Sequence, residues 1–135
     1  MTNQVLLDTD IVLFFWREHE NVMKRATNYI ISFGKLSFTE LTWYEVIRGY
    51  KAIGAYRQLE TFNAFCQDCN ILLLDHKALD YAATIYADLR RRGRLIGEMD
   101  ILIAGIALAN GMGVATRNID HFSRIHGLYV EDWTL

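Results

Sequence analysis

The sequence predicts an α/β fold built on a mainly parallel sheet, and two observations support this. Short apolar runs that suit buried strands alternate with longer segments whose apolar residues recur every three to four positions, as in helices. The strand runs are apolar throughout, which is typical of parallel sheets covered on both faces. The 135 residues are 52% hydrophobic and 22% charged, as in ordinary globular proteins, and we expect one domain over residues 1–135.

The strands are the shorter runs. The first, Val5–Leu7, stops at Asp8, and further apolar runs predict strands at 36–38, 71–74, 113–116 and 128–130.

The helices are the longer periodic segments. Helical spacing of apolar residues predicts helices over 20–32, 40–53, 55–66, 77–92 and 98–110. Glycines follow three of them and predict where they stop: Gly54, Gly93 and Gly111.

Composition excludes several function classes. Fourteen Lys and Arg against sixteen Asp and Glu give a net charge of -2, so the chain is not a uniformly basic nucleic-acid binder. Two cysteines exclude a disulfide scaffold, and the pair Cys66-x-x-Cys69 lacks the second pair of a zinc site, so we expect reduced thiols. The longest apolar stretch, Ile101–Ala109, is far below the ~20 residues of a membrane span. Without a signal-peptide pattern, we expect a cytoplasmic protein with no membrane association.

Acidic residues gather where the fold predicts chemistry. Asp8, Thr9 and Asp10 follow the first strand, and the fourth strand ends in Thr116, with Asn118 and Asp120 close behind. Because the carboxyl ends of parallel strands meet at one edge of the sheet, we expect these segments to lie together. Two helices supply further carboxylates near this edge, Glu45 and Asp100.

Each of these residues also has a structural interpretation. Asp8 is a preferred N-cap, Thr42-x-x-Glu45 matches a capping box, and Asp100 complements a helix dipole. Glu45 also suits an ion pair with Arg48, and Asp120 suits a turn. Taken together, however, converging carboxylates repel one another and favour a bound divalent cation. Oxygen ligands favour Mg²⁺, or Mn²⁺, and the scattered histidines offer no zinc site.

Four segments, in order, resemble the PIN-domain ribonucleases, specifically the VapC toxins of toxin–antitoxin pairs. The segments are Leu6–Asp10, Thr42–Gly49, Arg92–Ala104 and Ala115–Asn118. The resemblance implies a three-layer α/β/α sandwich and a metal-dependent endoribonuclease that inhibits translation by cutting structured RNA such as tRNA or rRNA, leaving a 5′-phosphate and a 3′-hydroxyl.

The resemblance also assigns roles to residues. Asp8, Glu45 and Asp100 match the three acidic metal-site positions of the family. The fourth family acid lies at the position of Asn118 or three residues later, where this chain has His121, so Asn118 and Asp120 are alternatives for this ligand. The family often has Asn at Asp10, which either binds the metal through water or caps a helix. Two threonines, Thr9 and Thr116, either orient the acids and the phosphate or are turn residues.

Partners follow from the same resemblance. It implies a homodimer and a VapB-like antitoxin that blocks the acidic cleft. A local basic patch could bind RNA phosphates, or could be a solvated helix end in which Arg92 pairs with Asp88. The patch consists of Arg90, Arg91, Arg92 and Arg94, and Arg48 adds a further positive charge.

Two other functions remain open from the sequence. Asp-x-Asp after the first strand also suits a haloacid-dehalogenase-like phosphatase in which Asp8 is the nucleophile and Asp10 the acid, although Glu45 then has no role. The incomplete fourth acidic position suits a PIN-fold interaction module without catalysis.

Overall fold

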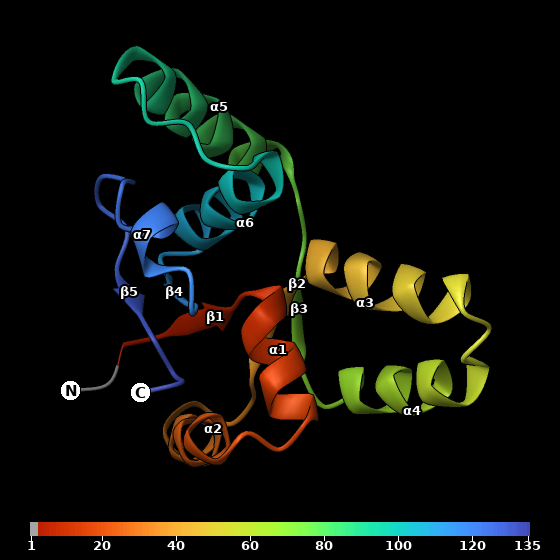
Figure 1. The fold of residues 1–135 in the computed structure, drawn as a ribbon. Helices are drawn as coiled ribbons and strands as arrows, with labels where there is room; N and C mark the ends of the chain where they lie inside the picture. Colours follow the sequence, from red (N-terminus) through yellow and green to blue (C-terminus); the bar gives the residue numbers. More distant parts are fainter. Residues whose placement is uncertain (1–2) are drawn as a thin grey trace.

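The computed structural model describes residues 3–135 and contains a central sheet of five parallel strands (Figure 1). Their order across the sheet is β3-β2-β1-β4-β5. The strands are β1 (Val5–Leu7), β2 (Ser37–Thr39), β3 (Asn70–Leu72), β4 (Gly113–Ala115) and β5 (Val130–Glu131). All five predicted strands are therefore present, with boundaries shifted by one or two residues.

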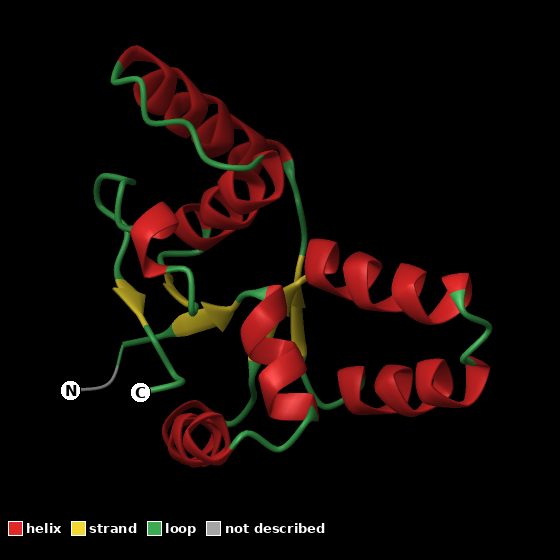
Figure 2. Cartoon of the chain, viewed as in Figure 1, coloured by secondary structure: helices red, strands yellow, loops and turns green. Residues whose placement is uncertain are grey.

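Within residues 3–135, seven helices surround this sheet, and Figure 2 shows the strands lying between them. They are α1 (Thr9–Trp16), α2 (Glu20–Phe33), α3 (Glu40–Ala52), α4 (Tyr56–Cys66), α5 (His76–Arg91), α6 (Glu98–Ala109) and α7 (Ile119–Phe122). Five of them correspond to the predicted helices. The other two, α1 and α7, are additions to the sequence prediction, and both begin directly behind a strand end.

Two cores, one on each face of the sheet, make the molecule a three-layer α/β/α sandwich. Alternate residues of β1 point to opposite faces, so Val5 and Leu7 join a core with α1, α2, α3 and α4, whereas Leu6 joins a core with α5, α6 and α7. The predicted α/β/α architecture with a parallel sheet is confirmed.

A close approach of the two backbones fixes the packing of α6 against α5. Helices α5 and α6 pack closely, and a Cβ added at Gly105 in α6 would lie 2.6 Å from the carbonyl oxygen of Ala78 in α5. Only a glycine allows this approach without a shift of backbone. The packing positions α6, whose first turn carries Asp100.

No helix within residues 3–135 combines the length and the apolar character needed to cross a membrane.

Candidate metal centre

The carboxyl ends of β1 and β4 bring the predicted acidic segments together. These strands are neighbours, with Leu7 opposite Ala115, so the next residues on each strand, Asp8 and Thr116, lie side by side. The Thr116 hydroxyl donates a hydrogen bond to Asp8 Oδ2. The backbone N–H of Asn118 donates to the same hydroxyl at 2.8 Å. Thr116 thus ties the first acidic residue to the loop behind β4.

Asp8 is buried, with only 5% of its surface exposed. Its Oδ1 accepts a hydrogen bond from Ile11 N at 3.1 Å, so it caps α1, as its structural interpretation predicted. Burial raises the pKa of Asp8 from 3.8 to about 7; the hydrogen bonds from Thr116 and Ile11 oppose this, and the charges of Asp10 and Asp100 add to it. Its carboxylate is therefore costly to ionise, and a nearby cation would favour the ionised form.

Glu45, on α3, is held by hydroxyl groups. Thr9 donates to Glu45 Oε1 at 2.7 Å, and the Thr42 hydroxyl lies 3.0 Å from that of Thr9. Because the Thr9 proton points to Glu45, Thr42 is the donor to Thr9. The capping-box interpretation of Thr42 and Glu45 is wrong, since Thr39 is the residue that caps α3. Thr9 therefore couples Glu45 to the end of β1.

Asp100 meets residues of the loop and helix that follow β4. Its Oδ2 lies 3.1 Å from Nδ1 of His121 and 3.5 Å from Nδ2 of Asn118. The last two atoms are 2.7 Å apart. The sequence interpretation gave His121 no role, and the available signal was its place three residues after Asn118, one of the two positions at which the resemblance implies an acid.

Two of the candidate residues lie outside this arrangement. Asp120 has a side chain that is 75% exposed and pairs with Arg124 at 2.8 Å. The adjacent residue, His121, makes the contact with Asp100 instead. Asp10 is exposed in the first turn of α1. Of the two alternatives for the fourth position, the structure thus brings Asn118 to Asp100.

The basic patch is partly engaged in structural contacts. Arg92 pairs with Asp88 at 2.6 Å, as its structural interpretation predicted, and also donates to the carbonyl oxygen of Arg124. Arg90 donates to the hydroxyl of Tyr86 at 3.3 Å.

Two cations are closer to the acidic edge. Arg48 has a side chain 57% exposed, lies 4.0 Å from Glu45 and stacks over Tyr44. Arg117, which the sequence interpretation left without a role, is exposed directly after Thr116 and lies over the ring of Phe14.

The donor set fits a hard divalent cation. Hydrogen bonds of Thr116 and Asn118 link Asp8 to Asp100, and Glu45 is hydrogen-bonded to Thr9, the residue after Asp8. In the part of the chain that the structure describes, no three His, Cys, Asp or Glu residues are close enough to hold an ion by themselves. Mg²⁺ keeps several waters and needs only one or two direct carboxylates, so this spacing is compatible with a hydrated ion.

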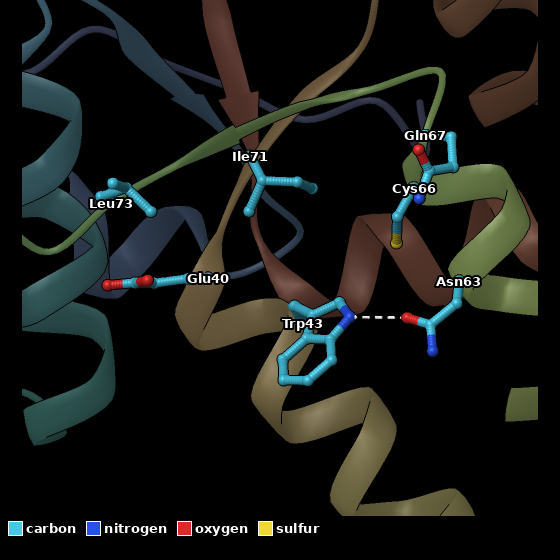
Figure 3. Close-up of a pocket in the computed structure, with 7 residues that line it drawn as sticks. All are labelled: Glu40, Trp43, Asn63, Cys66, Gln67, Ile71 and Leu73. Atoms are coloured by element: carbon cyan, nitrogen blue, oxygen red, sulfur yellow. Dashed lines mark hydrogen bonds between the residues drawn. The ribbon is translucent and has the colours of Figure 1, made fainter.

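A surface hollow beside α3 and α4 is separate from these residues (Figure 3). It is lined by Glu40, Trp43, Asn63, Cys66, Gln67, Ile71 and Leu73. Burial raises the pKa of Cys66 to about 11. It is also the largest cause that raises the pKa of Cys69 to about 12, so both free thiols stay protonated. None of the acidic residues described above lines the hollow, so it is not part of the candidate metal centre.

Comparisons with known proteins agree with this geometry. The family model for the PIN domain matches residues 5–128. A tRNA(fMet)-specific endonuclease VapC of Shigella flexneri is 32% identical over 96% of this chain and 97% of its own length. A protein of the same name from Salmonella typhimurium is 30% identical over 95% of this chain and 96% of its own.

Solved structures show the same fold. The DNA-bound VapBC of Salmonella typhimurium superposes with a TM-score of 0.84 at 28% identity, covering 98% of this chain and 99% of that one. VapBC2 of Rickettsia felis, bound to a promoter DNA fragment, has a TM-score of 0.84 at 23% identity, over 96% and 98%. The chain therefore belongs to the PIN-domain family and, within it, to the VapC-type toxins.

Proposed function

We propose that this protein is a divalent-metal-dependent endoribonuclease that hydrolyses RNA phosphodiester bonds and acts as the toxin of a toxin–antitoxin pair. The observation that supports it best is the buried Asp8, whose pKa is raised and which faces other acids at the carboxyl edge of a parallel sheet. Such an arrangement favours a cation. The names of the VapC relatives, which include ribonucleases and tRNA-specific endonucleases, support the same reaction.

Asp8, Glu45 and Asp100 would hold Mg²⁺ or Mn²⁺. When bound, such an ion supplies an activated water and stabilises charge on the phosphate. The chain's own residues prepare the site: Thr116 fixes the direction of Asp8 Oδ2, and Thr9 fixes Glu45 Oε1. These side chains are thereby oriented before a substrate arrives, which reduces the reorganisation that the reaction requires.

The RNA backbone would be held by arginines that are free of buried partners. We propose Arg48 and Arg117 as the contacts closest to the acids, with Arg90, Arg91 and Arg94 further along the same basic side. Arg92 is a weaker choice because Asp88 and the Arg124 carbonyl already occupy its guanidinium. Contacts of this kind do not read sequence, so cleavage should weaken as salt rises.

Substrate and partners follow from the relatives. We propose tRNA as the first substrate to test, because two relatives are named for tRNA(fMet), with rRNA as the second. Neighbouring structures are VapBC complexes, which supports a VapB-like antitoxin partner. We also propose that the toxin is a homodimer and that it acts in the cytoplasm. The haloacid-dehalogenase alternative is wrong, since the chain belongs to the PIN-domain family and Asp10, its acid, lies exposed on α1.

The test is cleavage of purified tRNA and rRNA by the isolated chain with Mg²⁺ or Mn²⁺, and with EDTA. We expect metal-dependent cleavage giving 5′-phosphate ends. Asp8→Asn, Glu45→Gln and Asp100→Asn should each lower the rate by at least about 100-fold while the circular dichroism spectrum stays that of a folded protein. Asp75→Asn, which changes an exposed cap of α5, is the matched control and should cleave normally.

Two results would contradict the proposal. Equal cleavage by the wild type and Asp100→Asn would mean that the activity comes from elsewhere. A folded wild type that cuts none of these RNAs with either ion would favour the alternative of a non-catalytic interaction module.

A further inference from the structure

Three polar groups from two separate parts of the chain lie close together at the first turn of α6. They are Asp100 Oδ2, His121 Nδ1 and the side-chain amide of Asn118, and the three distances between them are 2.7, 3.1 and 3.5 Å. The Asp100 and His121 side chains remain accessible, 26% and 38% exposed. An incoming ion or water can therefore reach them.

Hydrogen bonding within this group depends on the orientation of the Asn118 amide. With the NH₂ group toward His121, a protonated Nδ1 donates to Asp100 but faces that NH₂ group at 2.7 Å, and an unprotonated Nδ1 accepts from Asn118 but turns its lone pair to Asp100 at 3.1 Å. With the amide rotated, its oxygen faces Nδ1, and a protonated Nδ1 donates to both Asp100 and Asn118.

A bound cation also suits the group with the amide rotated. It attracts the lone pairs of both Nδ1 and Oδ2, and rotation of the Asn118 amide presents its oxygen to the same point. Donors at right angles around an ion with bonds of about 2.1 Å lie about 3.0 Å apart. The three observed separations bracket this value, so the group has the dimensions of one face of an octahedral site.

We propose that His121 is a nitrogen ligand of the catalytic metal, bound with Asp100 and the Asn118 carboxamide oxygen, and that it makes the site selective for Mn²⁺ over Mg²⁺. Mg²⁺ prefers oxygen donors, whereas imidazole nitrogen binds first-row transition ions better. Mn²⁺ is the member of that series that also accepts a carboxylate-rich, octahedral site. This inference rests on the proposed function, because it assigns a ligand to the metal site of that reaction.

The contact with Asp100 places a nitrogen donor at this site. In this chain the carboxylates of Asp10 and Asp120 are exposed, and Asp120 pairs with Arg124. The side chain in contact with Asp100 is an imidazole, so the donor set is mixed nitrogen and oxygen.

The experiment measures bound metal directly. Wild type, His121→Asp and His121→Ala are titrated calorimetrically with MnCl₂ and with MgCl₂, and electron spin-echo envelope modulation is recorded on the Mn²⁺ complexes. His126→Ala is the matched control, since its side chain is 81% exposed and lies 4.0 Å from Asp88. Thermal unfolding of each variant establishes that it is folded.

We expect ¹⁴N modulation from a directly bound nitrogen in the wild type and in His126→Ala, and its loss in His121→Asp. The ratio of the Mg²⁺ to the Mn²⁺ dissociation constant should fall by about tenfold or more in His121→Asp, which restores an oxygen donor. His121→Ala should bind both ions more weakly.

The outcomes separate this inference from the proposed function. Metal-dependent RNA cleavage by a wild type that shows no ¹⁴N modulation, or by His121→Asp with an unchanged metal preference, would overturn the role of His121 and leave the nuclease intact. A folded wild type that binds neither ion and cuts no RNA would overturn both.

Discussion

Replacing Asp8 by asparagine should make the protein more stable at neutral pH without metal, even as it abolishes cleavage. The reason is that Asp8 is buried, and burial raises its pKa from 3.8 to about 7. Asparagine is close in shape and never ionises. Its oxygen can still accept from Ile11 N, and its NH₂ group can donate to the Thr116 hydroxyl, which can turn to accept.

The size and sign of the effect follow from proton linkage. Below the unfolded value of 3.8, Asp8 is protonated in both states and costs nothing. As pH rises from 3.8 to about 7, the unfolded chain releases this proton and the folded chain keeps it, so the free energy of unfolding falls. Each pH unit in this window is worth about 1.4 kcal/mol, which gives on the order of 4 kcal/mol across it.

The assay is urea unfolding in EDTA at pH values from about 4.5 to about 8, for the wild type and Asp8→Asn. The difference in the free energy of unfolding between the two proteins should grow with pH up to about 7 and then level off. Asp75→Asn, an exposed N-cap, should show no such growth. Added Mn²⁺ or Mg²⁺ should stabilise the wild type at the upper end of the range more than it stabilises Asp8→Asn. A pH-independent difference between wild type and Asp8→Asn would refute the reasoning.

Two further predictions concern the parts that hold Asp100 in place. Gly105→Ala should lower the free energy of urea unfolding by about 1–3 kcal/mol, because its Cβ would lie 2.6 Å from the Ala78 carbonyl oxygen. The control is Gly49→Ala on α3, whose Cβ would meet nothing within 4 Å and which should be neutral or stabilising. Equal effects of the two substitutions would contradict the packing argument. Arg124→Lys should remove at least one of the hydrogen bonds that bind the Arg94 and Leu95 carbonyl oxygens, so hydrogen exchange of the loop before α6 should accelerate without global unfolding. Unchanged exchange there would show that the loop does not depend on Arg124.

The sequence was sufficient for the architecture because the strands carry their own signal. Val5–Leu7 is buried on both faces, so it is apolar throughout, and the same holds for Gly113–Ala115. Helix α5 was recognisable because only one of its faces is buried, which spaces Ala78, Ala82 and Leu89 periodically. Neither α1 nor α7 has such a pattern: the first is almost wholly apolar after its first turn, and the second has four residues.

The candidate site could be predicted only in part for a similar reason. Sheet topology brought Asp8 and Thr116 together, since the ends of adjacent parallel strands must meet. The contact of His121 with Asp100 spans 21 residues and depends on how α7 turns after β4, which no local pattern encodes. Asp120 illustrates the consequence, because a difference of one residue on a helix turns a side chain to another face.

Neutral hydroxyl groups explain how acids can share this edge in the absence of a cation. Thr116 donates to Asp8, and Thr9 donates to Glu45, so each carboxylate has a donor that brings no positive charge. Arginines in these places would neutralise the acids permanently and compete with a metal ion, whereas a hydroxyl orients a carboxylate and leaves its charge available. Among the lysines and arginines of residues 3–135, Arg48 is the one that pairs with any of these acids; it is 4.0 Å from Glu45 and largely exposed, where its attraction is weak. Neutral hydroxyl groups therefore hold these carboxylates in place without neutralising them. The negative charge of the site continues to favour a bound cation.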